Sequence, residues 1–418
     1  MTTKPIKTNS RNDTPAQSCP IHSSGSLPAR KTTPPDEKHA STSRIGRDAA
    51  GVWHVHGFAE AKALLRSTRT RQAGFMAERV ALLPDTMRPP VLFQEGKAHF
   101  GQRTKTARFF TPATTDKNYR AFMNAYADDL VAELVAHGRA DVSDLSMRLA
   151  VQVAAGVVGL TDSRVPGMAG RINAFFEQRQ TQSRAGRLLE ELLGQWRTAK
   201  FFFLDVQSAI AARRRAPKED LISHLIGEGY GNAEILTECV TFAAAGMVTT
   251  REFIGVAAWH LLEHPELKTR YLNAPQGERY ALLHELLRLE PVVGHLLRRT
   301  QEDIEVQSEG QDVTIPAGDL IDVHLYSVNA DETAVGDAPL TLCPERKRAA
   351  GVQPFAMSFG DGHHRCPGAF IAIQETDIFL TRLLALGGLV LEKAPELSWN
   401  DVVGGYELRE FWVRLDAA

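Results

Sequence analysis

One cysteine of this chain stands in a setting suited to holding a metal cofactor. Cys366 lies in the glycine-rich stretch 359–370, where a thiolate could ligate haem iron and push electron density toward O–O cleavage. Backbone N–H groups of a tight loop, and a helix starting at Pro367, are expected to stabilise that thiolate. The glycines that permit positive φ angles and close approach to a flat ligand are Gly360, Gly362 and Gly368. These residues alone allow two interpretations, a haem-thiolate loop and an ordinary glycine-rich turn with a buried cysteine.

Three further pairs have spacings that could do chemistry. His99 and Arg103 are four residues apart, so one helical face would carry two cationic donors able to grip a pair of carboxylates such as haem propionates. Ala245 and Thr249 share a face in the same way, with the hydroxyl pointing into whatever groove lies there. Glu285 and Arg288 could form an i,i+3 ion pair, although such a pair alone is usually solvated.

Together these motifs resemble the cytochrome P-450 family. Phe359, Gly362, His364 and Gly368 stand at minus seven, minus four, minus two and plus two from Cys366, which is similar to the haem-binding pattern of that family. The three pairs resemble, in the right order, the propionate-binding helix, the oxygen-activation segment and the E-x-x-R core pair. The resemblance covers residues 46–418.

The resemblance implies a fold and an activity. It implies a mainly α fold with small β-sheets, in which haem b lies between a long central helix and the Cys loop. The implied reaction inserts one oxygen atom from dioxygen into an apolar small molecule. A ferredoxin or flavodoxin with an NAD(P)H-dependent reductase would supply electrons, since no flavin or iron–sulfur motif remains in the chain. A monomer is expected.

The resemblance also assigns roles to residues. The implied metal ligand is Cys366. The implied cofactor contacts are His99, Arg103, Ala245, Arg298, Phe359, Gly360, His364 and Gly368. The implied catalytic residues are Thr249 and Thr250. The implied substrate pocket contains Phe75, Val80, Ala245, Val248, Val292, Val293, His295, Leu296 and Tyr406. Glu285 and Arg288 would be structural, with Arg346 or Arg348 as third member.

One position departs from the family pattern. The residue before Thr249 is usually an acid that opens a proton path, and here it is Val248. Glu252 lies one turn further on, where Arg251 could neutralise it. Water and Thr249 could suffice for proton delivery, or the delivery is unusual. Two alternatives therefore stay open: a hydrogen-peroxide-driven peroxygenase, and a non-catalytic haem-thiolate binder or sensor.

Composition limits the possible partners and the possible location of the protein. The chain has 418 residues, 43% of them hydrophobic, and a net charge of −2, which gives no sign of nucleic acid or an anionic membrane as main partner. Its four cysteines form no C-x-x-C pair, which is typical of a reducing cytoplasm. No window approaches 18 consecutive apolar residues, so no membrane anchor is expected. Residues 1–45 are polar and predict a disordered arm.

The periodicity predicts the elements that would position these residues. The stretch 232–263 has no proline and predicts one long central helix. Shorter helices are predicted at 58–66, 281–290 and 369–386, and strands near 52–56, 303–306, 313–315 and 320–325. The irregular apolar stretch 67–95 predicts a lid, and 402–408 a turn that dips into the pocket.

Overall fold

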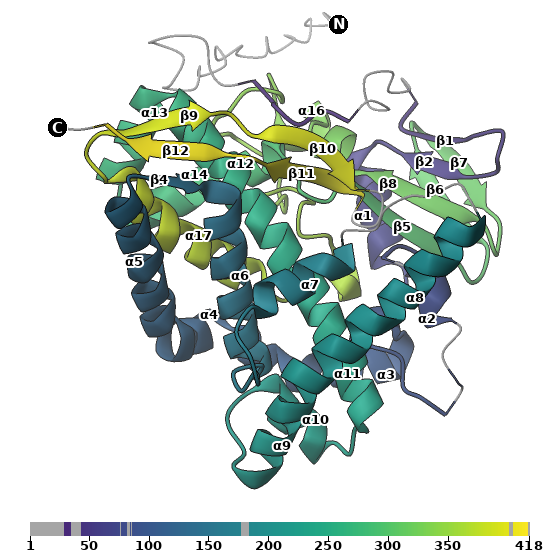
Figure 1. Cartoon of the computed structure of the whole chain (residues 1–418). Helices are drawn as coiled ribbons and strands as arrows, with labels where there is room; N and C mark the ends of the chain where they lie inside the picture. The colour runs from purple at the N-terminus through teal and green to yellow at the C-terminus, as the bar shows by residue number, and fades with distance from the viewer. Residues whose placement is uncertain are drawn as a thin grey trace, which may run out of the picture.

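The helices form the larger part of the molecule. A computed structural model describes residues 29–34, 43–75, 77–81, 84, 86–176, 184–400 and 404–416. Its α-helices are α1 (Phe58–Arg66), α2 (Ala77–Val80), α3 (Gly96–Thr106), α4 (Pro112–Thr114), α5 (Arg120–His137), α6 (Val142–Val158), α7 (Met168–Phe176), α8 (Arg184–Phe201), α9 (Gln207–Arg215), α10 (Leu221–Gly227), α11 (Asn232–Ala243), α12 (Thr249–Glu263), α13 (Pro265–Asn273), α14 (Gln276–Leu289), α15 (Leu325–Val328), α16 (Glu332–Val335) and α17 (Ala369–Leu384). Figure 1 shows them gathered beside and beneath the sheets.

The strands form small sheets, as expected for a mainly α fold. They are β1 (Ile45–Arg47), β2 (Trp53–Val55), β3 (Thr70–Gln72), β4 (Arg139–Asp141), β5 (His295–Thr300), β6 (Ile304–Ser308), β7 (Gln311–Ile315), β8 (Leu320–His324), β9 (Leu389–Lys393), β10 (Glu396–Asn400), β11 (Gly405–Arg409) and β12 (Trp412–Leu415). The largest sheet has the order β1-β2-β8-β5-β3, with β2 and β8 parallel. The others are β4-β12-β9, β10-β11 and β6-β7. The predicted strands near 52–56, 303–306, 313–315 and 320–325 match β2, β6, β7 and β8.

The predicted long helix is present, with a change of winding at its centre. Residues Asn232–Glu263 form one continuous helix, in which the π-helical turn η7 (Ala244–Val248) separates α11 from α12. This helix is the one in the described part of the chain that is long and apolar enough to cross a membrane, and 62% of its most apolar window is buried. It crosses the middle of the molecule (Figure 1) and packs against α6 and α17, as a core helix does.

Two hydrophobic clusters hold the elements together. The larger one joins α5, α6, α12, α14 and α17, and includes residues such as Met123, Ile254 and Phe379 that are 0% exposed. The smaller one lies between α1 and the largest sheet, around Leu64 and Val323. Burial of apolar side chains on this scale is the main stabilising contribution to such a fold. The segment that leads into the Cys loop contacts both clusters. Met357 belongs to the smaller cluster, and Phe359 packs against the larger one.

The N-terminal segment differs in part from the predicted disordered arm. Residues 1–28 and 35–42 lie outside the described residues. Residues 29–34, however, pack against the core: Ala29 bridges to Thr341, and Thr32 is 0% exposed. The Thr32 hydroxyl donates to Glu290 Oε2 at 2.6 Å, and the backbone N–H of Lys31 donates to Glu290 Oε1 at 2.6 Å. A buried carboxylate that needs donors therefore orders this short polar segment.

Candidate haem-thiolate site

The Cys366 loop has the conformation that its glycines predict at two of three positions. Gly360 and Gly362 have φ values of 67° and 68°, in the left-handed region that favours glycine. A Cβ at Gly362 would collide with the backbone of Leu65 at the end of α1, so a side chain cannot be placed there. Gly368 instead has φ −83°, and α17 begins at Ala369, two residues after Pro367. The short 3₁₀ turn η8 (Gly362–His364) precedes the cysteine.

Backbone donors converge on the Cys366 thiol. Its own N–H donates to the Phe359 carbonyl at 2.9 Å, which closes the loop. Burial among protein atoms raises the pKa of the Cys366 thiol, while N–H groups of Gly368 and Ala369 and the charges of Arg103 and Arg365 oppose that shift. The side chain nevertheless has solvent-accessible surface. A sulfur that is reachable and surrounded by donors is suited to ligate a metal as a thiolate.

A cluster of nitrogen donors lies beside the loop. His99, on α3, is 3% exposed, and its ring centroid lies 4.3 Å from that of His364. Burial, with the charges of His364 and Arg103, lowers the pKa of His99 to about 4, so this ring is neutral at pH 7. Arg103, one turn on, donates to the Arg365 carbonyl next to the cysteine. The predicted pair therefore does share one helical face directed at the Cys loop.

A carboxylate of the chain itself occupies the centre of this cluster. Both oxygens of Glu95, the N-cap residue of α3, lie 3.1 Å from His364 Nε2, and Oε2 lies 3.4 Å from His363 Nε2. Burial alone would raise the pKa of Glu95, but the hydrogen bond and charge of His364 hold it below its usual value. Sequence reasoning missed Glu95. A carboxylate is the kind of group that this cluster binds.

Arg298 supplies a buried cation with an unused donor. It lies on β5, is 3% exposed, and donates from Nη1 to Gln72 Oε1 at 2.5 Å. Its Nε has no hydrogen-bond partner among the described residues. Burial lowers the pKa of Arg298 to about 10, against the opposing charge of Glu95. A buried guanidinium N–H without an acceptor is costly, and a cofactor carboxylate would satisfy it. The residues present therefore fit haem: a thiolate loop and a carboxylate-binding cluster.

The Glu285–Arg288 pair on α14 is buried and braces the Cys loop. Arg288 donates from Nη2 to Oε1 at 2.8 Å and from Nε to Oε2 at 2.9 Å, and the two side chains are 0% and 1% exposed. Arg346, not Arg348, is the third member, since its Nε donates to Glu285 Oε1 at 3.0 Å. The pair is therefore not the solvated surface contact that its spacing alone would suggest.

The brace continues from Arg288 to the residues just before the loop. Arg288 Nη1 donates to the Asn329 carbonyl at 2.8 Å, and the Asn329 side-chain oxygen accepts from the Met357 N–H at 2.9 Å. The Asn329 amide also donates to Ser358 Oγ at 2.8 Å. A fixed path of hydrogen bonds thus runs from α14 to the segment that enters the loop.

On the central helix, the oxygen-activation segment coincides with the π-helical turn η7. The Thr249 hydroxyl donates to the Ala245 carbonyl at 2.5 Å, and both residues keep exposed surface. Val248 is 1% exposed and packs in the interior. Single π-turns inside α-helices are frequent at functional sites, because they displace one residue from the regular ladder. The structure therefore leaves a hydroxyl, and no acid, at this point of the helix.

The acid next along the helix is fully engaged elsewhere. Glu252 is 1% exposed and accepts from Arg251 Nε at 2.7 Å, from the Leu408 N–H at 2.7 Å and from Arg409 at 2.8 Å. Arg251 does pair with it, as expected. Glu252 is thus a structural link between α12 and β11.

A different acid, which sequence reasoning missed, contacts this helix. Glu375 on α17 is 3% exposed, accepts a hydrogen bond from the Thr250 side chain, and has an Oε2 without partner among the described residues. Burial raises the pKa of Glu375 well above its usual range, which favours the protonated form of the side chain, although the Thr250 hydrogen bond opposes that shift. The only sequence signal for it is a charged residue on the otherwise apolar face of the helix after Cys366.

The residues predicted for the substrate pocket divide into two groups. Phe75, Val80, Val293 and Leu296 are partly exposed. Val292 and Tyr406 are 6% and 1% exposed, and the Tyr406 hydroxyl donates to the Glu290 carbonyl at 3.3 Å. The structure therefore places Tyr406 in the core. Phe359 is partly buried against Phe355, with ring centroids 4.9 Å apart.

His295 lies on the other side of its strand from the cofactor contacts. Side chains of a strand alternate between faces, so His295 and Leu297 point away from the face of Leu296 and Arg298. Leu296 Cδ1 lies 3.8 Å from the position of a Cβ on Gly360, which identifies the face of the Cys loop. His295 Nδ1 instead lies 3.0 Å from Asp322 Oδ1. The alternation of side chains along β5 therefore places His295 on the face opposite the Cys loop, and not in the predicted pocket lining.

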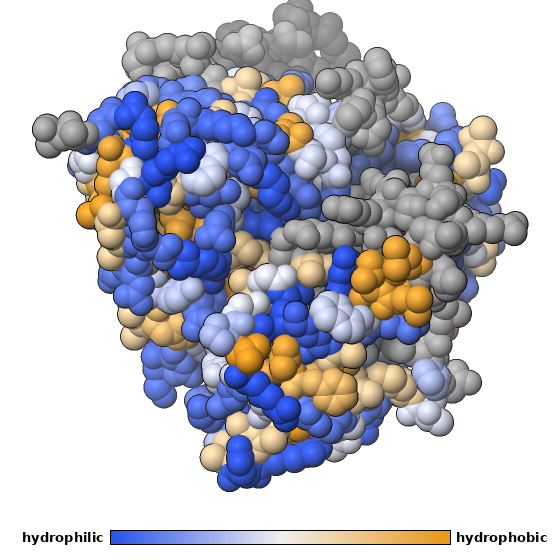
Figure 2. Space-filling view, viewed as in Figure 1, coloured by the Kyte–Doolittle hydropathy of each residue, from blue (hydrophilic) through white to orange (hydrophobic). Residues whose placement is uncertain are grey.

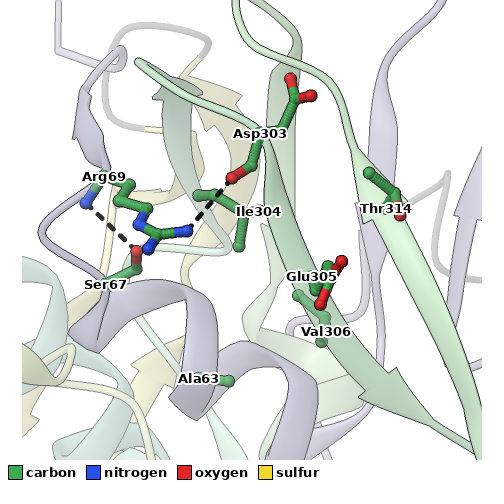
Figure 3. Close-up of a pocket in the computed structure, with 8 residues that line it drawn as sticks. All are labelled: Ala63, Ser67, Arg69, Asp303, Ile304, Glu305, Val306 and Thr314. Carbon is green, nitrogen blue, oxygen red and sulfur yellow. Dashed lines mark hydrogen bonds between the residues drawn. The ribbon is translucent and has the colours of Figure 1, made fainter.

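A surface pocket elsewhere contains none of the predicted site residues. Figure 3 shows it between the end of α1 and the β6–β7 hairpin, where Arg69 donates to the Asp303 carbonyl. Its lining residues are Ala63, Ser67, Arg69, Asp303, Ile304, Glu305, Val306 and Thr314. The haem-thiolate site described above is a separate feature.

Comparison with known proteins gives one family. Residues 280–386 match the family model described as Cytochrome P450. The chain is 26% identical over 363 residues to the erythromycin C-12 hydroxylase of Saccharopolyspora erythraea, covering 84% of this chain and 86% of that protein. It is 26% identical over 361 residues to the biotin biosynthesis cytochrome P450 of Bacillus subtilis, covering 84% and 85%.

Solved structures with a similar fold point to the same family. The crystal structure of CalO2 superposes with a TM-score of 0.73 at 25% identity, covering 90% of this chain and 93% of that one. Cytochrome P450 CYP109Q5 from Chondromyces apiculatus gives a TM-score of 0.70 at 25% identity, with the same coverage. The matched model spans both the Glu285–Arg288 pair and the Cys366 loop. These similarities, together with the Cys366 loop, support a bacterial-type cytochrome P450 monooxygenase whose cofactor is haem b.

Proposed function

We propose that this protein inserts one oxygen atom from dioxygen into an apolar small molecule, as a soluble, cytoplasmic monomer that receives electrons from a separate ferredoxin or flavodoxin. The observation that carries the proposal is the Cys366 sulfur, with converging backbone donors, beside a cluster that binds carboxylates. In this proposal Cys366 is the iron ligand, and His99, Arg103, Arg298 and His364 hold the propionates.

Haem with a thiolate ligand supplies O–O cleavage and oxygen transfer when bound. The chain contributes position and protons. Phe359, Gly360 and Gly368 shape the loop around the sulfur, and Ala245 lets the cofactor approach the central helix. Thr249 donates its hydroxyl proton to the Ala245 carbonyl, and a rotation about χ1 would turn this proton toward a water or substrate in the groove beside the helix.

The proposal also names a proton donor for the reaction, the Glu375 side chain. Val248 offers no acid, and Glu252 is held by two arginines and a backbone N–H. Glu375 is buried, has a pKa that burial raises, and is hydrogen-bonded to Thr250, the residue next to Thr249. Thr250 thus acts as a positioning residue, and Glu375 replaces the acid that the family usually carries on the central helix.

Thr249→Ala is expected to divert most reducing equivalents into hydrogen peroxide, because the hydroxyl that orders the proton donor is lost. The measurement is the ratio of product formed to NAD(P)H consumed. Thr241→Ala is the matched control, since the Thr241 hydroxyl makes the same bond in the same helix, to the Thr237 carbonyl at 2.8 Å. Equal coupling in both variants would remove Thr249 from the proton path.

Glu375→Gln is expected to slow reductase-driven turnover by on the order of 100-fold, the low end of what a positioned acid contributes. Glutamine keeps the hydrogen bond to Thr250 but cannot release a proton. Peroxide-driven turnover should be unchanged, because peroxide brings both the oxygen and its protons. Glu238→Gln is the control: burial raises the pKa of Glu238 to about 8, and among the described residues it accepts from the Val91 N–H alone. Equal loss in both reactions would give Glu375 a merely structural role.

The substrate class rests on the apolar side chains near the site. Phe75, Val80, Val293 and Leu296 keep exposed surface. A separate apolar patch on the exposed face of α8 is visible in Figure 2. Leu189, Leu192 and Trp196 form that patch. One relative is named for a hydroxylation of erythromycin and another for biotin biosynthesis, so apolar substrates of very different shape stay open. Spectral titration against a diverse panel of apolar compounds tests the class.

The specific observation at Val248 also favours a second candidate, a peroxygenase. Without an acid on the central helix, a route in which hydrogen peroxide supplies oxygen becomes competitive. Turnover with peroxide that exceeds turnover with every ferredoxin or flavodoxin system would establish it. The relatives named as a hydroxylase and a monooxygenase support an enzyme over the binder or sensor alternative.

A further inference from the structure

Four histidines gather on one face of the largest sheet, away from the haem-thiolate site. His54 lies on β2, His324 on β8 and His295 on β5, and His56 follows β2. The His324 ring is central: its centroid lies 4.3 Å from that of His56, 4.7 Å from His295 and 5.0 Å from His54. None of these four histidines has a role in the proposed oxygen-insertion reaction.

The strand register puts a carboxylate among these rings. Asp322 stands opposite His54 in the parallel β2–β8 ladder, and His324, two residues on, points to the same face. His324 in turn stands opposite His295 in the antiparallel β5–β8 ladder. The cluster is therefore fixed by backbone pairing of three strands, which hold side chains more rigidly than loops do.

We propose that His54, Asp322 and His324 form a binding site for a divalent transition-metal ion, with Zn²⁺ as the probe. His54 Nδ1 lies 2.8 Å from His324 Nε2, and Asp322 Oδ2 lies 3.6 Å from His324 Nε2 and 4.0 Å from His54 Nδ1. Ligand atoms at about 2.0 Å from a tetrahedral Zn²⁺ are roughly 3.3 Å apart, so these three distances bracket the required spacing.

The residues around the three ligands resemble the outer support of a metal site. His54 Nε2 lies 3.2 Å from Asp48 Oδ2, the carboxylate–histidine arrangement that fixes a ligand's tautomer. His295 Nδ1 lies 3.0 Å from Asp322 Oδ1 and 3.1 Å from Oδ2, so this ring holds the carboxylate whose Oδ2 also faces the other two ligands. Burial would raise the pKa of Asp322, but His295, His324 and His54 hold it below its usual value, so the carboxylate is ionised.

The ligand set selects the kind of ion. Two imidazole nitrogens and one carboxylate suit Zn²⁺, Ni²⁺, Co²⁺ or Cu²⁺, whereas Mg²⁺ and Ca²⁺ prefer oxygen alone. His54 is 33% exposed at its side chain and His324 is 9% exposed, so an ion can enter from the β1–β2 edge and meet a partly buried ligand. A bound ion would clamp β2 to β8, and through Asp322 and His295 to β5, which carries Arg298.

A second group with metal-ligand spacing, Glu95, His363 and His364, belongs to the haem-thiolate site. The test therefore uses haem-loaded, full-length protein without a polyhistidine tag, stripped with a chelator. Zn²⁺ binding is measured by competition with a chromophoric chelator. One equivalent should bind per chain. His54→Ala should weaken binding at least about 100-fold by removing a ligand, and Asp48→Asn about 10-fold by removing its support.

The control and a second variant make the result decisive. His137→Ala removes an exposed histidine that bonds only to its own helix, and should leave Zn²⁺ affinity unchanged. Asp322→Asn, which keeps the shape of the side chain, should weaken binding as His54→Ala does. Added Zn²⁺ should raise the Tm of the parent protein and not that of His54→Ala. Absence of stoichiometric binding, or parent-like affinity in His54→Ala or Asp322→Asn, would overturn the proposal.

Discussion

Cys366→Ala is expected to abolish the red-shifted carbon monoxide spectrum of the reduced protein and to reduce oxygen insertion to background. The reason is the loss of the one sulfur that stands in a donor-lined loop. Alanine fits the space, and the loop backbone is held by its own bonds, such as the Cys366 N–H to Phe359 carbonyl at 2.9 Å. Haem could still be retained by the propionate contacts, so the spectrum and the haem content are measured together.

Cys239→Ala is the control for this change. Cys239 is the other free cysteine in the described part of the chain, and it is 0% exposed in the helical core. Burial raises the pKa of its thiol far above the neutral range, so it carries no thiolate. Cys239→Ala should keep the red-shifted carbon monoxide spectrum and lose only the packing contacts of the Cys239 side chain in the core. A red-shifted spectrum retained by Cys366→Ala would disprove the ligand assignment.

Glu285→Ala is expected to lower the free energy of unfolding by about 3–5 kcal/mol, because it leaves two buried arginines without their carboxylate. Arg288 and Arg346 are 0% and 4% exposed at their side chains. The Cys343 N–H, which donates to Glu285 Oε1 at 3.1 Å, also loses its acceptor. Against a total stability of about 5–15 kcal/mol, the loss is large enough to unfold part of the population.

The change should reach the haem-thiolate site as well. Arg288 holds Asn329, and Asn329 holds Met357 and Ser358 at the entrance of the Cys loop. Urea unfolding followed by circular dichroism gives the stability, and the carbon monoxide spectrum reports the thiolate. Both should decline together if the brace positions the loop.

Glu396→Ala serves as the control for the buried pair. Glu396 forms an ion pair with Lys393 at the same three-residue spacing, at 2.8 Å, but the two side chains are 66% and 45% exposed. Solvent-exposed pairs contribute little, so its loss should change stability by at most about 0.5 kcal/mol. Similar losses in the two variants would show that burial of Glu285 is not what gives the pair its strength.

The parts of the fold that follow from local patterning could be predicted from the sequence. The helix Phe58–Arg66 follows from apolar periodicity. The continuous helix Asn232–Glu263 follows from the absence of proline within it and from Pro265 just past its end. The Cys loop followed from glycine spacing. The π-helical turn at Ala244–Val248 could not be predicted, because local propensity carries no signal for it and its tertiary neighbour, α6, comes from a distant part of the chain.

The residues that sequence reasoning missed are defined by contacts across long stretches of chain. Glu95 meets His364 across 269 positions, and Thr32 meets Glu290 across 258. The pKa of Glu375 is raised because α17 buries this side chain against Thr250 on α12. A charged residue on an apolar helix face hints at such an acid, but the local pattern does not show what it contacts. The same holds for His295, whose place on the strand depends on the pleat of β5 rather than on its neighbours.

The central claim is oxygen insertion from dioxygen at a haem held by Cys366. The most direct test uses an apolar compound selected by spectral titration, a ferredoxin or flavodoxin system, isotopically labelled dioxygen, and catalase to remove peroxide. The account predicts a product that carries one labelled oxygen atom, formed by the parent protein and not by Cys366→Ala. Unlabelled product, or product formed only when peroxide is supplied, would contradict it.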